Sequence, residues 1–132
     1  MLYFYGDWML AALRIVLGLT LAIHGFPKLK DLKTTSANFG AMGFRPGAFW
    51  GPLVAVVEFF GGLALMLGIW TEVAAALFVG QFAVITIWKL AKRQAFVGGY
   101  EIDLLILAAA LVILTQGAGA VSLDRYLYGA WL

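Results

Sequence analysis

Four apolar stretches, separated by polar connections, dominate the pattern of the chain. A helix that rises about 1.5 Å per residue needs about 20 residues to cross the roughly 30 Å hydrocarbon core of a bilayer. The pattern predicts transmembrane helices over residues 8–27, 50–70, 72–88 and 100–117. Tryptophan, which is typical of membrane interfaces, stands at an end of each of the first three stretches. We expect an all-α integral membrane bundle of four helices, forming a single domain over residues 1–132.

The connections predict how these helices are joined. Thr71 alone separates the second and third stretches, so these two helices should form an antiparallel hairpin. The hydroxyl of Thr71 can cap the third helix, while Glu72 complements the positive end of its dipole. The first connection, residues 28–49, is long and mixes apolar with polar positions, so we expect a short amphipathic or re-entrant segment there.

Composition supports a membrane location and excludes several functions. Hydrophobic residues make up 64% of the chain and charged residues 12%, with a mean hydropathy of +0.95. A soluble domain has roughly 45–50% apolar and about 25% charged residues. The chain has no cysteine, which excludes disulfides, thiol chemistry and cysteine-bound iron–sulfur or zinc sites within it. A net charge of +2 is too small to indicate nucleic-acid binding.

The basic residues predict an orientation. Cytoplasmic loops of membrane proteins carry an excess of lysine and arginine. Loops 28–49 and 89–99 together hold seven basic residues, whereas the opposite face has only Arg125. We therefore expect both loops in the cytoplasm and both termini outside.

Small residues mark faces on which the predicted helices could approach closely, since helix association in lipid depends on close packing. Such faces occur on the first three helices: Gly18 and Ala22, Gly61 and Gly62, and Ala76 and Gly80.

Polar residues inside the predicted helices are candidates for function, because they are expensive in lipid. From helix spacing, Arg14 lies about 9 Å from the outer face and Glu58 about 12 Å from the cytoplasmic face. We expect five side chains to share one inner polar column: Arg14, His24, Glu58, Gln81 and Glu101.

Each of these residues has a structural and a functional interpretation. Glu58 could form an ion pair with Arg14 that joins two helices, or it could exchange protons or bind a headgroup, and both could hold together. His24 could bond a backbone carbonyl or deliver protons. Glu101 could serve the dipole of the fourth helix, with Asp103 as a solvated acid. One histidine among scattered carboxylates gives no metal site.

Several short motifs resemble the DoxX family of small four-helix membrane proteins. They cover nearly the whole chain in order: Arg14, HGFPK at 24–28, GFRP at 43–46, VEFFGG at 57–62, LGIWTEVAA at 67–75, GGYE at 98–101 and SLD at 122–124. The family is similar to the membrane subunit of thiosulfate:quinone oxidoreductase, and some members are described as parts of oxidoreductase complexes. The resemblance implies a protein of the prokaryotic plasma (inner) membrane. It carries the family's polar pattern onto Arg14, His24, Lys28, Glu58 and Glu101.

Together these features predict a membrane subunit associated with an oxidoreductase, with quinone as the candidate cofactor. Arg14, His24, Glu58, Gln81 and Glu101 are the candidate binding residues, and Glu58 and His24 the candidates for proton exchange. Electrons would come from a partner, because the chain has no flavin, haem or iron–sulfur signature. The alternative is a non-catalytic accessory or structural subunit of a larger membrane protein complex. The expected partners are membrane lipid and either a larger membrane-protein complex or further copies in a homo-oligomer. A small transporter is a third reading.

Overall fold

The computed structural model of the chain describes residues 5–119 and 122–128, so the ends of the predicted domain 1–132 lie outside it. The described part is helical throughout its regular structure. Its elements are α1 (Gly6–Lys30), α2 (Leu32–Met42), α3 (Gly47–Leu67), α4 (Thr71–Ala91), the short η2 (Phe96–Tyr100), α5 (Glu101–Gln116) and α6 (Leu123–Tyr128).

Four helical segments of the described chain are long and apolar enough to span a membrane: residues 6–30, 47–67, 71–91 and 96–116. They confirm the predicted all-α membrane bundle. In each of these segments, at most 39% of the most apolar 18-residue stretch is buried within the protein. Most of their surface is therefore left for lipid.

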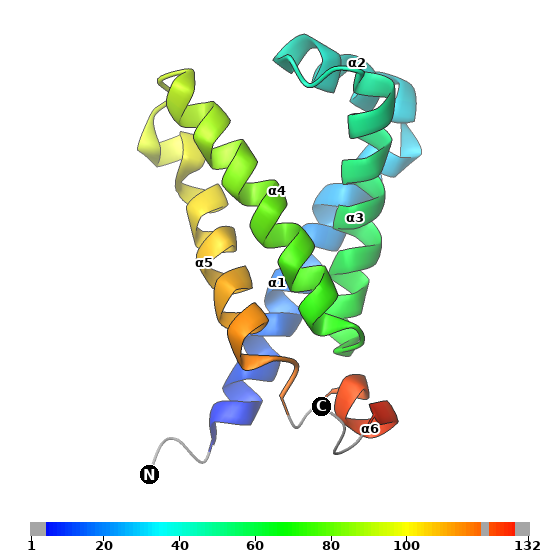
Figure 1. Cartoon of the computed structure of the whole chain (residues 1–132), viewed down its shortest axis with the longest axis vertical. Coiled ribbons are helices and arrows are strands. Elements are labelled where there is room, and N and C mark those ends of the chain that lie inside the picture. The colour runs from blue at the N-terminus through cyan, green and yellow to red at the C-terminus, as the bar shows by residue number, and fades with distance from the viewer. Residues whose placement is uncertain (1–4, 120–121, 129–132) are drawn as a thin grey trace.

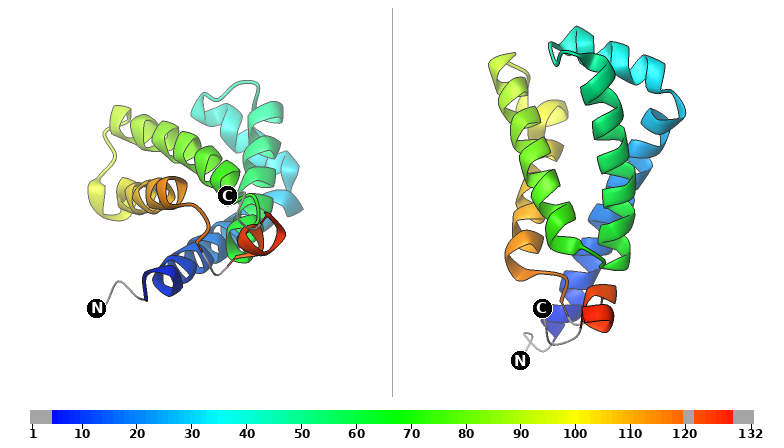
Figure 2. Two further views of the ribbon diagram at one scale, coloured as in Figure 1. Left: turned by 60° about the horizontal axis from the view of Figure 1, so that its bottom comes forward. Right: turned by 45° about the vertical axis from the view of Figure 1, so that its right-hand side comes forward.

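The long helices form two arms of a V (Figure 1). One arm is α1 packed along α3, and the other is α4 packed along α5. The arms meet near α6 and diverge toward α2, as both views of Figure 2 also show. We call these two ends of the molecule the α6 end and the α2 end. The amino end of α1 lies at the α6 end, so the V opens away from it.

Two small residues set the crossing of α1 and α3. A Cβ atom on Gly18 would overlap the carbonyl oxygen of Gly62, and a Cβ on Gly62 would overlap the backbone of α1 in return. The backbones therefore touch, as the predicted small-residue faces require. The predicted face on α4 is different, since Gly80 and Ala76 are exposed and a Cβ on Gly80 would meet no atom within 4 Å.

The apolar core lies where the two arms meet. Its largest fully buried apolar side chains come from all four long helices: Leu21, Leu65, Phe78 and Ile113. Since this core lies toward the α6 end, the helices are free to separate near α2.

The long first connection contains α2, which packs against the first turns of α3. Asp31 caps this helix by accepting hydrogen bonds from the backbone N–H and the hydroxyl of Thr34. The hydrogen bonds, that from the side chain first, hold the pKa of Asp31 below its ordinary value. Gly43, with a φ of 101°, ends the helix in the left-handed conformation.

The cap of α4 differs from the prediction. The hydroxyl of Thr71 is buried and has no hydrogen-bond partner among the described residues. The carboxylate of Asp124 caps the helix instead, accepting from the backbone N–H groups of Trp70 at 2.7 Å and Thr71 at 3.0 Å. The prediction was wrong because it looked for the cap next to the helix, whereas α6 supplies it from 53 residues further along the chain.

Candidate functional site

Glu58 on α3 is the most deeply buried acid among the described residues and lies between two other helices. It is 2% exposed. The Nζ of Lys28 on α1 lies 2.9 Å from each of its carboxylate oxygens, and Nε2 of Gln81 on α4 donates to Oε1 at 2.8 Å. Three helices thus converge on one carboxylate. A buried charge needs such partners, because water is not there to solvate it.

The geometry of α1 explains why Lys28 reaches Glu58. The helix continues through Pro27 to Lys30, three residues beyond the predicted end of the first apolar stretch. Gly25 and Lys28 are therefore neighbours on one face of α1. A Cβ on Gly25 would lie 2.9 Å from Cβ of Glu58. This close approach brings the lysine side chain against the carboxylate.

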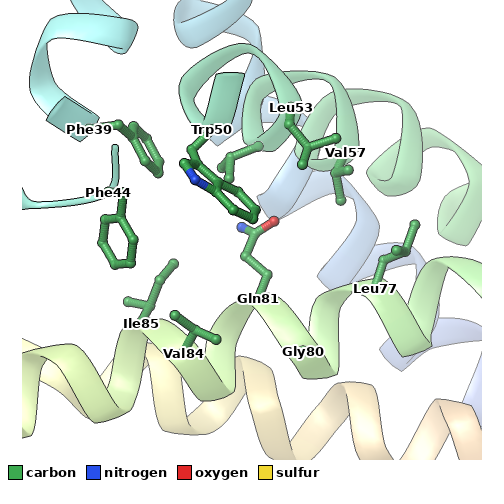
Figure 3. Close-up of a pocket in the computed structure, with 11 residues that line it drawn as sticks. Phe39, Phe44, Trp50, Leu53, Val57, Leu77, Gly80, Gln81, Val84 and Ile85 are labelled. Carbon is green, nitrogen blue, oxygen red and sulfur yellow. The ribbon is translucent and has the colours of Figure 1, made fainter. Parts of the chain in front are cut away.

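An apolar cavity of about 380 Å³ lies between α3 and α4, under the connection that follows α2. Its lining comes from α2, this connection, α3 and α4: Phe39, Phe44, Trp50, Leu53, Val54, Val57, Leu77, Gly80, Gln81, Val84 and Ile85 (Figure 3). Figure 3 shows the Gln81 amide pointing from α4 toward α3, with the rings of Phe39, Phe44 and Trp50 toward α2. Gln81 therefore links the cavity to the buried carboxylate of Glu58.

The cavity is partly open at the surface of the protein. Four of its lining residues have large apolar side chains that are exposed: Trp50 is 41% exposed, Leu53 40%, Leu77 50% and Val84 51%. These residues belong to helices that are long and apolar enough to span a membrane. The volume of the cavity falls within the roughly 300–1,000 Å³ of ordinary ligand sites.

The structure separates Arg14 from Glu58. The Nε of Arg14 donates to the carbonyl of Leu65 at 2.7 Å, and Nη1 donates to the carbonyl of Ala118. Arg14 lies 11 residues before Gly25 on the same helix, which corresponds to about 16 Å. The expected ion pair of Arg14 with Glu58 is thus replaced by the pair with Lys28, and Arg14 joins α1, α3 and the segment after α5 near the α6 end.

His24 and Glu101 also lie away from Glu58. The His24 ring is exposed, and its Nδ1 lies 2.6 Å from the carbonyl oxygen of Thr20, which it contacts as a donor. This contact fits the interpretation of His24 as a residue that bonds a backbone carbonyl. Glu101 accepts a hydrogen bond from the N–H of Gly98 at the start of α5. Of the five predicted column residues, the structure brings together Glu58 and Gln81.

Helix spacing did not predict two residues that form buried ion pairs, Lys28 and Asp103. Lys28 was counted as a loop residue, although its place three residues after Gly25 would have signalled a shared face. Asp103, expected to be solvated, is 8% exposed and lies 2.6 Å from Nζ of Lys89. Since Lys89 is on α4 and Asp103 on α5, this ion pair joins the two helices. Within the described ranges, histidine and acidic side chains form no group of three that could hold a metal ion.

Comparisons with known proteins agree with this architecture. A family model described as DoxX matches residues 9–91. The chain is 28% identical over 118 residues to the Bacillus subtilis (strain 168) protein named "Putative oxidoreductase CatD", covering 88% of this chain and 84% of that protein. It is 32% identical over 123 residues to the "Inner membrane protein YqjF" of Escherichia coli (strain K12), covering 89% and 91%. No solved structure matches the chain.

Proposed function

We propose, from the premise that this chain belongs to the DoxX family, that it is a membrane subunit of an oxidoreductase and binds a quinone headgroup between α3 and α4. The observation that carries the proposal is the cavity itself, an aromatic and aliphatic site with one amide that is hydrogen-bonded to a buried ion pair. The oxidoreductase name of the Bacillus subtilis relative supports a redox context.

The lining suits a flat, largely apolar ring. Phe39, Phe44 and Trp50 offer aromatic surfaces for stacking, and aromatic walls are common in small-molecule sites. A quinone carbonyl accepts hydrogen bonds, and the Gln81 amide has a second N–H besides the one that Glu58 accepts. The opening toward hydrocarbon leaves room for an isoprenoid tail to extend into lipid.

A quinone, when bound, supplies an acceptor for two electrons and two protons. The chain's own residues orient and hold charge around it. Glu58 accepts from Nε2 of Gln81 and thereby fixes the direction of the amide. Lys28, whose side chain is 34% exposed, holds the carboxylate and connects it to the α2 end. Glu58, which is bonded to the Gln81 amide, and its partner Lys28 are the groups that we assign to proton exchange, and a partner protein supplies the electrons.

The test is the quinone content of protein purified in gentle detergent. Gly80 lines the cavity and a Cβ there meets no atom, so Gly80→Leu should fill the space with little strain on the backbone. Gly40 on α2 is equally unobstructed but does not line the cavity, which makes Gly40→Leu the matched control. We expect bound quinone by mass spectrometry in the wild type and in Gly40→Leu, and its loss in Gly80→Leu. Absence of quinone from the wild type, or equal retention in Gly80→Leu, would refute the proposal.

A second candidate function is that of a non-catalytic accessory subunit. It is favoured by the way the buried charges are satisfied within the chain, as Lys89 does for Asp103 and backbone N–H groups do for Asp124. Such contacts hold neighbouring helices together and require no ligand. This function predicts co-purification in a fixed ratio with larger membrane subunits and no quinone in the complex.

A further inference from the structure

The α2 end of the molecule carries more cations than its own acids neutralise. The four acids of this end each accept hydrogen bonds from within the chain: Asp31, Glu58, Glu101 and Asp103. Five cations of this end form no ion pair with any residue that the structure describes: Lys30, Lys33, Arg45, Lys92 and Arg93. All five are exposed, so this end presents a basic surface on both arms of the V.

At the open end of the V, the end of α2 reaches across to α4 and forms a junction between the two arms. The indole Nε1 of Trp88 on α4 donates to the carbonyl of Met42 at the end of α2, at 3.0 Å. The ring of Phe44 packs on the same indole, with 6.2 Å between centroids. The Nζ of Lys92 lies 6.0 Å from the centroid of the Trp88 ring. Arg45 directly follows Phe44 in the connection after α2, so a second cation lies one residue along the chain from a ring that packs on Trp88.

We propose that Arg45 and Lys92 bind the phosphate of an anionic phospholipid at this junction, so that one lipid bridges the two arms. Arginine binds phosphate through two parallel hydrogen bonds and lysine binds it as a point charge. Tryptophan is typical of the depth at which lipid headgroups lie. Basic residues between or beside membrane-spanning helices recognise anionic headgroups.

A membrane lipid fits the junction better than a free anion because apolar surface lies beside it. Ile87 and Leu90, the neighbours of Trp88 on the last turns of α4, are 66% and 51% exposed. They offer a surface along which acyl chains can lie while the phosphate meets Arg45 and Lys92. The bound lipid would also hold Phe44 in place, which forms part of the cavity wall.

Native mass spectrometry of the full chain measures this site directly. The detergent-solubilised protein is mixed with phosphatidylglycerol or with phosphatidylcholine, and the lipid retained on the protein is counted. We expect phosphatidylglycerol to bind roughly tenfold more tightly than phosphatidylcholine, as two basic groups near one phosphate imply. The variant Arg45→Gln/Lys92→Gln should bind the two lipids about equally. The matched control Lys30→Gln/Lys33→Gln removes the same charge from the same end and should keep the preference.

The possible results separate the proposal from its rivals. Equal binding of both lipids by the wild type would overturn it. Loss of the preference in both double variants alike would show a diffuse effect of net charge and would overturn the assignment to the junction. Inorganic phosphate that displaces phosphatidylglycerol at comparable concentration would identify a plain anion site, and that result would exclude a lipid site.

Discussion

Lys28 places its Nζ 2.9 Å from both carboxylate oxygens of Glu58, and this contact joins helices α1 and α3 across 30 positions of sequence. The small residues near it bring the two backbones together, so the ion pair lies where the helices are already close. Because Gln81 adds a third helix to the same carboxylate, the contact also positions the amide that lines the cavity.

Removing Lys28 should destabilise the protein more than removing the whole pair. In Lys28→Met the buried carboxylate loses its counter-ion, and we expect a cost of about 2 kcal/mol, reduced from the usual value for buried pairs because Lys28 is partly exposed. The double variant Lys28→Met/Glu58→Gln should recover much of this loss, since no charge is then left buried. Unfolding in detergent measures both, with the exposed Lys33→Met as control. A double variant that is less stable than Lys28→Met would contradict this account.

The crossing of α1 and α3 should not tolerate a larger residue at Gly18. We expect Gly18→Ala to cost about 1–3 kcal/mol, because the new methyl group overlaps the carbonyl of Gly62 and the helices must separate. Gly80→Ala is the control and should be neutral or slightly stabilising, since its methyl group meets no atom and alanine favours helix. Thermal unfolding of the two variants side by side decides the matter. Equal destabilisation of both would mean that backbone contact is not what limits residue size at the crossing.

The cap that Asp124 supplies to α4 should contribute measurable stability. Replacing a capping side chain by alanine costs about 1 kcal/mol, and more where several N–H groups lose a buried acceptor. We expect Asp124→Ala to lower the unfolding temperature and to speed hydrogen exchange at the N–H groups of Trp70 and Thr71. Asp7→Ala removes an equal charge from an exposed position at the same end and should leave this exchange unchanged.

The pH dependence of the cap of α2 follows from the lowered pKa of Asp31. Hydrogen bonds from Thr34 favour the charged carboxylate, so the folded pKa lies below the ordinary value of 3.8. The stabilisation of α2 is therefore fully present above that ordinary value and is lost as the pH falls through the folded pKa. Thr34→Val removes the hydroxyl donor and should raise the pKa of Asp31, as an NMR titration of its carboxyl carbon would show. An unchanged titration would mean that the side-chain bond does not act on this group.

The orientation predicted from the basic loops is open to a direct test, because the chain has no cysteine of its own. Single replacements Lys33→Cys and Asp7→Cys lie at opposite ends of the fold. If the α2 end is cytoplasmic, a thiol reagent that cannot cross membranes should label Asp7→Cys in intact cells and Lys33→Cys only after lysis. The reverse pattern would invert the topology.

The helices could be predicted from sequence because their signal is local. Length, apolar content and terminal tryptophans fix where a span begins and ends to within a few residues, and the short link at Thr71 requires a hairpin. The contacts of the site could not be predicted in the same way, because they depend on how the helices pack against one another. The pairing of Lys28 with Glu58 needs α1 to continue past Pro27, a residue that ordinarily suggests a helix end.

The other differences between the prediction and the structure also arise from the packing of the helices. Depth counted from the predicted helix ends placed Arg14 and Glu58 in one column, but the register of α1 against α3, which brings Gly25 beside Glu58, was not available from spacing alone. The divergence of the two arms, which creates the cavity, arises because the core lies toward the α6 end. Such an arrangement depends on contacts among four helices, and no window of sequence contains it.

The cap on α4 also bears on the order in which the protein is made. Asp124 is synthesised 53 residues after Thr71, when the whole of α4 and α5 has already been made. Until then the first N–H groups of α4 lack this acceptor, so the α3–α4 hairpin is first made without its cap. The cap forms only once α6 has been made and folds back onto the turn at Gly68.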